Sequence, residues 1–250
     1  MKWHSVLLFS IGIGVIFAVA ILDPIPQDPL YHVFADQRTM AGIPNFLNVI
    51  SNLPFLLIGI MGWQTIAGNE ETVTPTTRLA WTIFFFGVAL TAIGSGYFHL
   101  QPNNDTLVWD RLPMTIAFMS LVSIIVSEYF SPQLGRQLLI PALLIGAASV
   151  GYWAYTESLG AGDLRPYAVV QFLPMLLIPI IITVKNSESD LGRYVWWMIA
   201  FYIAAKIAEQ LDDNLFALGN AVSGHSLKHV LASLAPAALM YGLMKRAEHS

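Results

Sequence analysis

The stretch PYAVVQFLPMLLIPIIITV, residues 166–184, is mostly apolar and contains no charged side chain. A helix needs roughly 20 such residues to cross the hydrocarbon core of a bilayer. Six further apolar stretches of similar length lie at about 45–66, 78–99, 107–130, 137–155, 194–214 and 225–245. Because strand-like alternation is missing, we expect an all-α fold, a polytopic bundle of seven transmembrane helices.

The composition of the whole chain also indicates a membrane protein. Its 250 residues are 56% hydrophobic and 11% charged, whereas a soluble domain carries roughly 25% charged residues. The net charge of −4, without a basic run, argues against nucleic acid as a partner. Because the chain has no cysteine, disulfides, thiol catalysis, Cys-ligated zinc and iron–sulfur clusters are excluded.

An eighth apolar run lies at about 5–22, ahead of the seven-helix domain that we expect over residues 23–250. Lys2 and the small residues Ala18-Val19-Ala20 are typical of a cleavable signal peptide, and they are equally compatible with an uncleaved extra helix. We favour the retained helix, because the run is close to spanning length and no polar stretch precedes the cleavage position.

Basic residues flanking the spans predict the orientation of the chain, since cytoplasmic loops carry an excess of Lys and Arg. Seven fall on one side: Lys2, Arg78, Arg136, Lys185, Arg193, Lys245 and Arg246. Three fall on the other: Arg38, Arg111 and Arg165. We therefore expect a cytoplasmic C-terminus and outward-facing loops after about residues 22, 99, 155 and 214.

Three histidines lie at helix ends on the predicted outward side. His99 closes one span, while His225 and His229 open the last one. The spacing of four residues puts His225 and His229 on one helical face. Three neutral imidazoles with an open fourth position form the ligand set of a catalytic zinc ion. The pair alone is also compatible with haem ligation or plain helix packing.

Two further polar residues accompany His99. Ser95 precedes it by four residues in Gly94-Ser95-Gly96-Tyr97-Phe98-His99, and Asp110 follows at the mouth of the next span. An ionisable residue at membrane depth is costly, so Asp110 is a functional candidate. The alternative for Asp110 is a simple interfacial ion pair with Arg111.

Four segments together resemble the alkaline ceramidases, which belong to a superfamily of seven-helix membrane hydrolases that includes the adiponectin-receptor group. The segments are Asn45–Asn52, Gly94–His99, Asp110–Met114 and His225–His229. The resemblance covers about residues 36–240 and includes the order of the motifs and both spacings of four residues.

The resemblance implies a zinc amidase within the bundle. It implies that His99, His225 and His229 bind Zn²⁺, that Asp110 is the acid/base beside the zinc-bound water, and that Ser95 steadies the oxyanion or the water. The implied partners are the bilayer and ceramide, or another N-acyl lipid, which would be cleaved to a sphingoid base and a fatty acid. A receptor or sensor with a structural metal and no hydrolysis is the alternative.

One segment departs from the family pattern. Animal members carry an acidic calcium-binding segment before the first family helix, whereas residues 34–44 here contain one carboxylate, Asp36, and one arginine, Arg38. Calcium prefers six to eight oxygen ligands, several of them carboxylates. We therefore expect no calcium site in this segment.

The spans contain further polar residues. Asn45, Asn48 and Asn52 step along one face, either as a polar wall around the zinc pocket or, as we favour, for interhelical hydrogen bonds. Lys206 and Glu209 are expected to pair. Asp212 could orient a ligand histidine, or could cap a helix.

Overall fold

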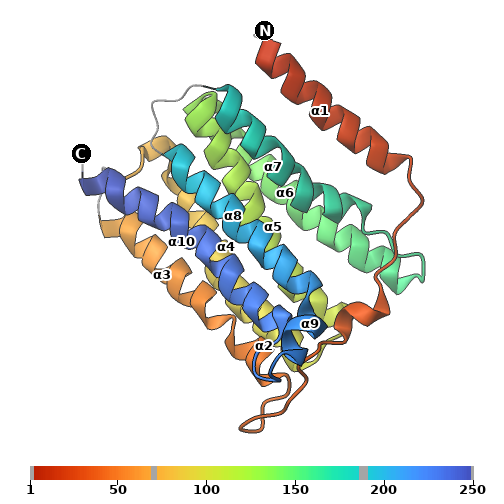
Figure 1. Cartoon of the computed structure of the whole chain (residues 1–250). Coiled ribbons are helices and arrows are strands. Elements are labelled where there is room, and N and C mark those ends of the chain that lie inside the picture. Colours follow the sequence, from red (N-terminus) through yellow and green to blue (C-terminus); the bar gives the residue numbers. More distant parts are fainter. Residues whose placement is uncertain (1–2, 69–71, 186–190, 249–250) are drawn as a thin grey trace. The chain divides into compact units, whose positions relative to one another are not determined.

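The computed structural model describes residues 3–68, 72–185 and 191–248, and within these ranges it contains helices and no β-strand (Figure 1). The α-helices are α1 Trp3–Ala20, α2 Phe46–Ile50, α3 Leu53–Gly68, α4 Pro75–Leu100, α5 Asn104–Tyr129, α6 Pro132–Ser158, α7 Arg165–Val184, α8 Leu191–Gln210, α9 Asp212–Ala217 and α10 Gly224–Glu248. A 3₁₀ turn covers Pro29–His32. The all-α prediction is therefore confirmed.

Six helical stretches of the described residues are long and apolar enough to cross a membrane. They are α2 and α3 taken together, α4, α5, α6, α7 and α10. Their bounds agree with six of the seven predicted spans to within five residues. The eighth run forms the shorter apolar helix α1, and its retention in the mature protein stays a prediction.

The remaining predicted span, at about 194–214, corresponds to α8, which is not among these six. It carries Arg193, Lys206 and Glu209, so its crossing of the membrane stays a prediction. The helix also ends earlier than expected, at Gln210, and the short α9 follows it. The predicted span ran too far because Asp212 and Asp213 belong to the first turn of α9 rather than to the end of α8.

The first predicted span is divided between α2 and α3. Ser51 and Asn52 lie at the break, and Pro54 occupies the second position of α3. Proline has no backbone N–H to donate to the carbonyl four residues earlier, so an uninterrupted helix would lose a hydrogen bond here. Ser51 and Asn52 therefore lie in a short turn between the two helices, outside both α2 and α3.

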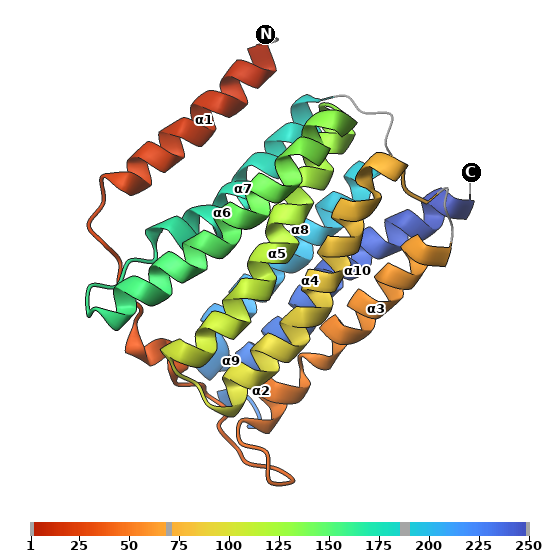
Figure 2. The ribbon, with the colours of Figure 1, turned by 180° about the vertical axis from the view of Figure 1, so that it is seen from behind.

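Contacts divide the chain into two compact units, and the first comprises residues 1–27, 75–84 and 115–189. Within this unit, α7 contacts α1 and α6 (Figure 2). Arg165, at the start of α7, donates hydrogen bonds to the carbonyls of Ala20 and Leu22 and to the Asp163 carboxylate. The Arg165 guanidinium lowers the pKa of Asp163 to about 2.

The second unit comprises residues 28–74, 85–114 and 190–250. Within it, α10 packs against α8 and α3 (Figure 1). The approach of α10 to α8 is close at Gly242, where an added Cβ would collide with the Tyr194 ring. Small residues at such crossings let helix backbones approach in membranes. This unit contains every residue that the sequence singles out for the metal site.

Candidate metal centre

The three predicted ligand histidines converge. His99 lies in the last turn of α4, and His225 and His229 lie in the first two turns of α10. All three side chains are buried, and one ring nitrogen from each lies within 4.8 Å of the others. Their ring centroids are 4.8 to 4.9 Å apart. Within the described ranges, this is the one group of three or more His or acidic side chains with such spacing.

The chemistry of these donors fits a metal ion. Nε2 of His99 lies 3.2 Å from Nε2 of His229, and two nitrogens bound to one tetrahedral zinc ion are separated by about 3.3 Å. The two Nε2 atoms therefore have the separation expected of two ligands of one ion.

The turn between α2 and α3 supports His229 from the side away from His99. Oγ of Ser51 lies 2.8 Å from Nδ1 of His229, and Nδ2 of Asn52 lies 3.3 Å from the same atom. Phe34 packs against the other two rings, with centroids 4.7 Å from His99 and 4.5 Å from His225. Each of the three imidazoles is therefore in contact with a neighbouring side chain from residues 34–52.

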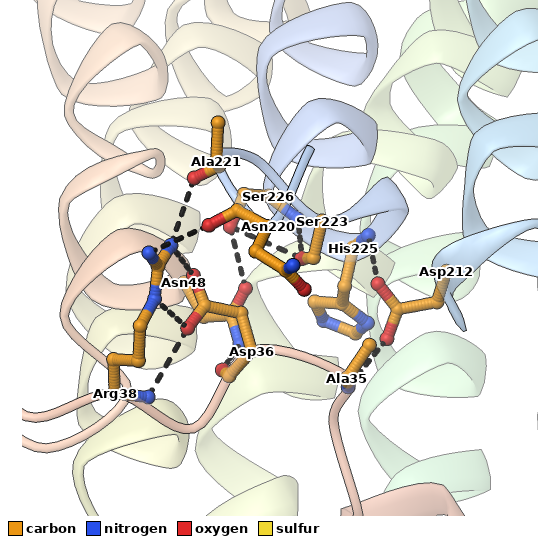
Figure 3. A network of polar contacts seen from close by, with 10 residues as sticks. All are labelled: Ala35, Asp36, Arg38, Asn48, Asp212, Asn220, Ala221, Ser223, His225 and Ser226. Atoms are coloured by element: carbon orange, nitrogen blue, oxygen red, sulfur yellow. Dashed lines mark hydrogen bonds and ion pairs between the residues drawn. The ribbon is translucent and has the colours of Figure 1, made fainter. Parts of the chain in front are cut away.

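Of the three asparagines, Asn45 and Asn48 make interhelical or helix–loop hydrogen bonds. Asn45 is in the left-handed backbone region, with φ of 47°, and its Nδ2 donates to the carbonyl of His99 at 2.9 Å. Nδ2 of Asn48 donates to the carbonyl of Asp36 at 3.1 Å, and its Oδ1 accepts from Ser226 at 2.7 Å (Figure 3). The structural interpretation holds for these two residues.

Ser95 and Asp110 are both buried and interact with each other. The side chain of Ser95 lies within hydrogen-bonding reach of the Asp110 carboxyl group. This contact depends on a close approach of α4 and α5, because a Cβ at Gly94 would collide with the carbonyl of Trp109. The neighbouring Arg111 guanidinium lies 5.8 Å from the centroid of the Tyr31 ring.

A cluster of charged side chains lies beside His225, and the sequence predicted only two of its three members. The predicted pair of Lys206 and Glu209 is present, with Nζ of Lys206 2.7 Å from Oε2. Nζ of Lys228 is 2.8 Å from Oε1 of the same carboxylate and 3.1 Å from Nε2 of His225. The signal for Lys228 was its position three residues after His225, which places both on one helical face.

Asp212 has the capping role rather than that of an imidazole partner. Its Oδ1 accepts from the backbone N–H of His225 at 2.7 Å, and its Oδ2 accepts from the N–H of Ala35 at 3.0 Å (Figure 3). The first N–H groups of a helix have no partner within the helix. Asp212 satisfies one of them and fixes the start of α10, which carries two of the histidines.

Arg38 joins the segment of residues 34–44 to the loop before α10. Its guanidinium contacts both carboxylate oxygens of Asp36, at 2.8 and 2.7 Å, and donates to the carbonyls of Asn220 and Ala221 at 2.7 and 2.8 Å (Figure 3). The bidentate hydrogen bonds from Arg38 lower the pKa of the buried Asp36 carboxyl. Asp36, the one carboxylate of residues 34–44, is thus paired with the Arg38 guanidinium.

Comparison with known protein families gives a match. The family model described as Ceramidase matches residues 38–248. The matched range includes the three histidines, Ser95 and Asp110, while Phe34 and Asp36 precede it. No curated protein matches the chain.

Proposed function

Because the chain belongs to the ceramidase family, we propose that it hydrolyses the amide bond of ceramide, or of a related N-acyl lipid, with a zinc ion held by His99, His225 and His229. The family indicates a hydrolase of amide bonds that works on a lipid in a membrane. The observation that carries the zinc proposal is the 3.2 Å separation of the His99 and His229 Nε2 atoms in a buried group of three imidazoles.

The residues around the histidines supply the remaining chemistry. Zinc, when bound, acts as a Lewis acid that polarises a carbonyl oxygen and lowers the pKa of water. The Asp110 carboxylate takes the proton of the attacking water and returns it to the leaving nitrogen, so that a fatty acid and an amine are formed. The Ser95 hydroxyl orients that carboxylate through their hydrogen bond.

Zinc quantitation and a panel of fluorescent N-acyl lipids test the proposal on the purified full chain in detergent. We expect about one zinc per chain and release of fatty acid from ceramide. His229→Ala should lose both metal and activity, because it removes one of three ligands. Asp110→Asn should keep the metal and lose roughly 10²- to 10⁴-fold in rate, because it removes the proton acceptor.

Two outcomes contradict the proposal. One is purified protein without zinc, and the other is a wild-type rate in Asp110→Asn. A receptor or sensor with a structural metal predicts a different pattern, in which metal is bound, no lipid is hydrolysed, and Asp110→Asn disturbs metal retention or folding.

A further inference from the structure

Lys228 lies beside the metal centre and has no part in the hydrolysis described above. It sits on α10 between the two ligand histidines, and 17% of its side chain is exposed. Nζ is 2.8 Å from Oε1 of Glu209 and 3.1 Å from Nε2 of His225. A lysine at membrane depth is costly and usually marks a functional pathway or site, so its position calls for a reason.

Lys228 is not the only partner of Glu209. The Glu209 carboxylate also holds Lys206, with Nζ 2.7 Å from Oε2. Lys206 is the more exposed of the two lysines, at 38% against 17% for its side chain. Lys228 is therefore the ammonium group on the inner side of the cluster, next to the imidazoles.

The hydrogen-bonding capacity of Lys228 is not exhausted. An ammonium group has three N–H donors, and among the described residues two are directed to Glu209 and His225. A neutral imidazole nitrogen has a single lone pair, so Nε2 of His225 cannot accept from Lys228 and bind a metal at the same time. When this nitrogen binds a metal, a second donor of Lys228 becomes available to a molecule in the site.

We propose that Lys228 binds the acyl side of the substrate: the carbonyl oxygen of the N-acyl lipid and, after cleavage, the carboxylate of the fatty-acid product. This rests on the proposed function. Hydrogen bonds between an ammonium and a carboxylate are roughly twice as strong as neutral ones. Lys228 thus holds the anionic product more tightly than the neutral amide and orients the acyl chain away from the leaving nitrogen.

Binding of laurate and dodecanol to the zinc-loaded full chain in detergent tests this without turnover. The two probes share an apolar tail and differ in charge. Lys228→Met keeps the aliphatic stem and removes the ammonium, so we expect laurate to bind about tenfold more weakly or worse, with dodecanol binding and zinc content unchanged. Inhibition of hydrolysis by free fatty acid should weaken in parallel, and Lys228→Arg should restore part of the laurate binding.

Lys206→Met is the matched control, because Lys206 shares Glu209 and lies further out. This variant should bind laurate like wild type.

Wild-type laurate binding in Lys228→Met overturns the proposal. Loss of zinc together with laurate binding also overturns it, by assigning Lys228 a structural role. If Lys228→Met does not fold, binding of laurate and dodecanol to Lys228→Gln is compared with wild type in the same way, and wild-type laurate binding again overturns the proposal. A chain that binds laurate through Lys228 but hydrolyses no lipid refutes the proposed function alone.

Discussion

The Ser51 hydroxyl determines how His229 presents its ring to the metal centre. With Oγ 2.8 Å from Nδ1, the natural arrangement has Nδ1–H donating to Ser51, which leaves Nε2 with its lone pair facing His99. Groups that hydrogen-bond to the far nitrogen of a ligand histidine fix its tautomer and orientation. The metal affinity of the centre is therefore expected to depend on a residue that binds no metal.

We predict that Ser51→Ala lowers zinc affinity by roughly 10- to 100-fold, measured by competition with a chelator on the purified chain. Thr65→Ala on α3 is the control, because its hydroxyl donates to the Met61 carbonyl in an exposed part of the helix that follows Ser51. Equal zinc affinity in Ser51→Ala and wild type would show that Ser51 does not support the ligand.

At the residue scale, the sequence was sufficient for some parts of the centre and not for others. Spacing identified His225 and His229, since four residues make one turn of helix whatever the tertiary structure. Ser51 gave no comparable signal, because it contacts a histidine 178 positions away. The position of Lys228 three residues after His225 put both on one helical face, but it did not show that Lys228 shares the Glu209 carboxylate with Lys206. Such contacts depend on how the helices pack.

Among the helices, the crossing of α4 and α5 positions the proposed acid/base. Gly94 faces the Trp109 carbonyl so closely that a Cβ would collide with it. Trp109 immediately precedes Asp110, and Ser95 immediately follows Gly94. The closeness of the two backbones is therefore what brings the Ser95 hydroxyl to the Asp110 carboxyl group.

We predict that Gly94→Ala forces α5 away from α4 and lowers amide hydrolysis by at least about tenfold, by misplacing Asp110, while zinc content stays near that of wild type. Gly96→Ala in the same helix is the control, because a Cβ there meets no atom within 4 Å. Both variants are assayed side by side for zinc and for fatty acid release. Wild-type hydrolysis in Gly94→Ala would contradict the prediction.

The ends of the elements were harder to predict than their existence. Apolar length identifies a span, but the course of the turn between α2 and α3, where Pro54 interrupts the helix, and the early end of α8 also depend on polar side chains that bond elsewhere. Ser51 turns toward His229, and Asp212 bonds to Ala35 and His225. A hydropathy pattern contains no information about partners so distant in the chain.

For the whole molecule, hydropathy predicts where the long apolar helices lie, and the predicted orientation in the membrane rests on the distribution of basic residues alone. We predict that Ser158→Cys is labelled by a membrane-impermeant maleimide from outside the cell, and that Gln133→Cys is labelled only after the membrane is opened. Both positions are exposed in the structure. Because the natural chain has no cysteine, each variant carries a single reactive thiol.

The reverse labelling pattern would show that the C-terminus and the metal centre lie on the opposite sides of the membrane from those expected. Equal labelling of both positions in intact cells would contradict a fixed orientation. Retained hydrolysis in both variants is the control that each protein is folded.

The convergence of His99 with His229, 130 positions apart in the chain, also orders the events of biosynthesis. A ribosome adds about 5–20 residues per second, so roughly ten seconds separate the synthesis of the first ligand from that of the last. Until α10 has left the translocon, the nascent chain holds one histidine of the three. Binding of the proposed zinc is thus expected late in maturation, and a chain truncated before its final helix is expected to insert without binding it.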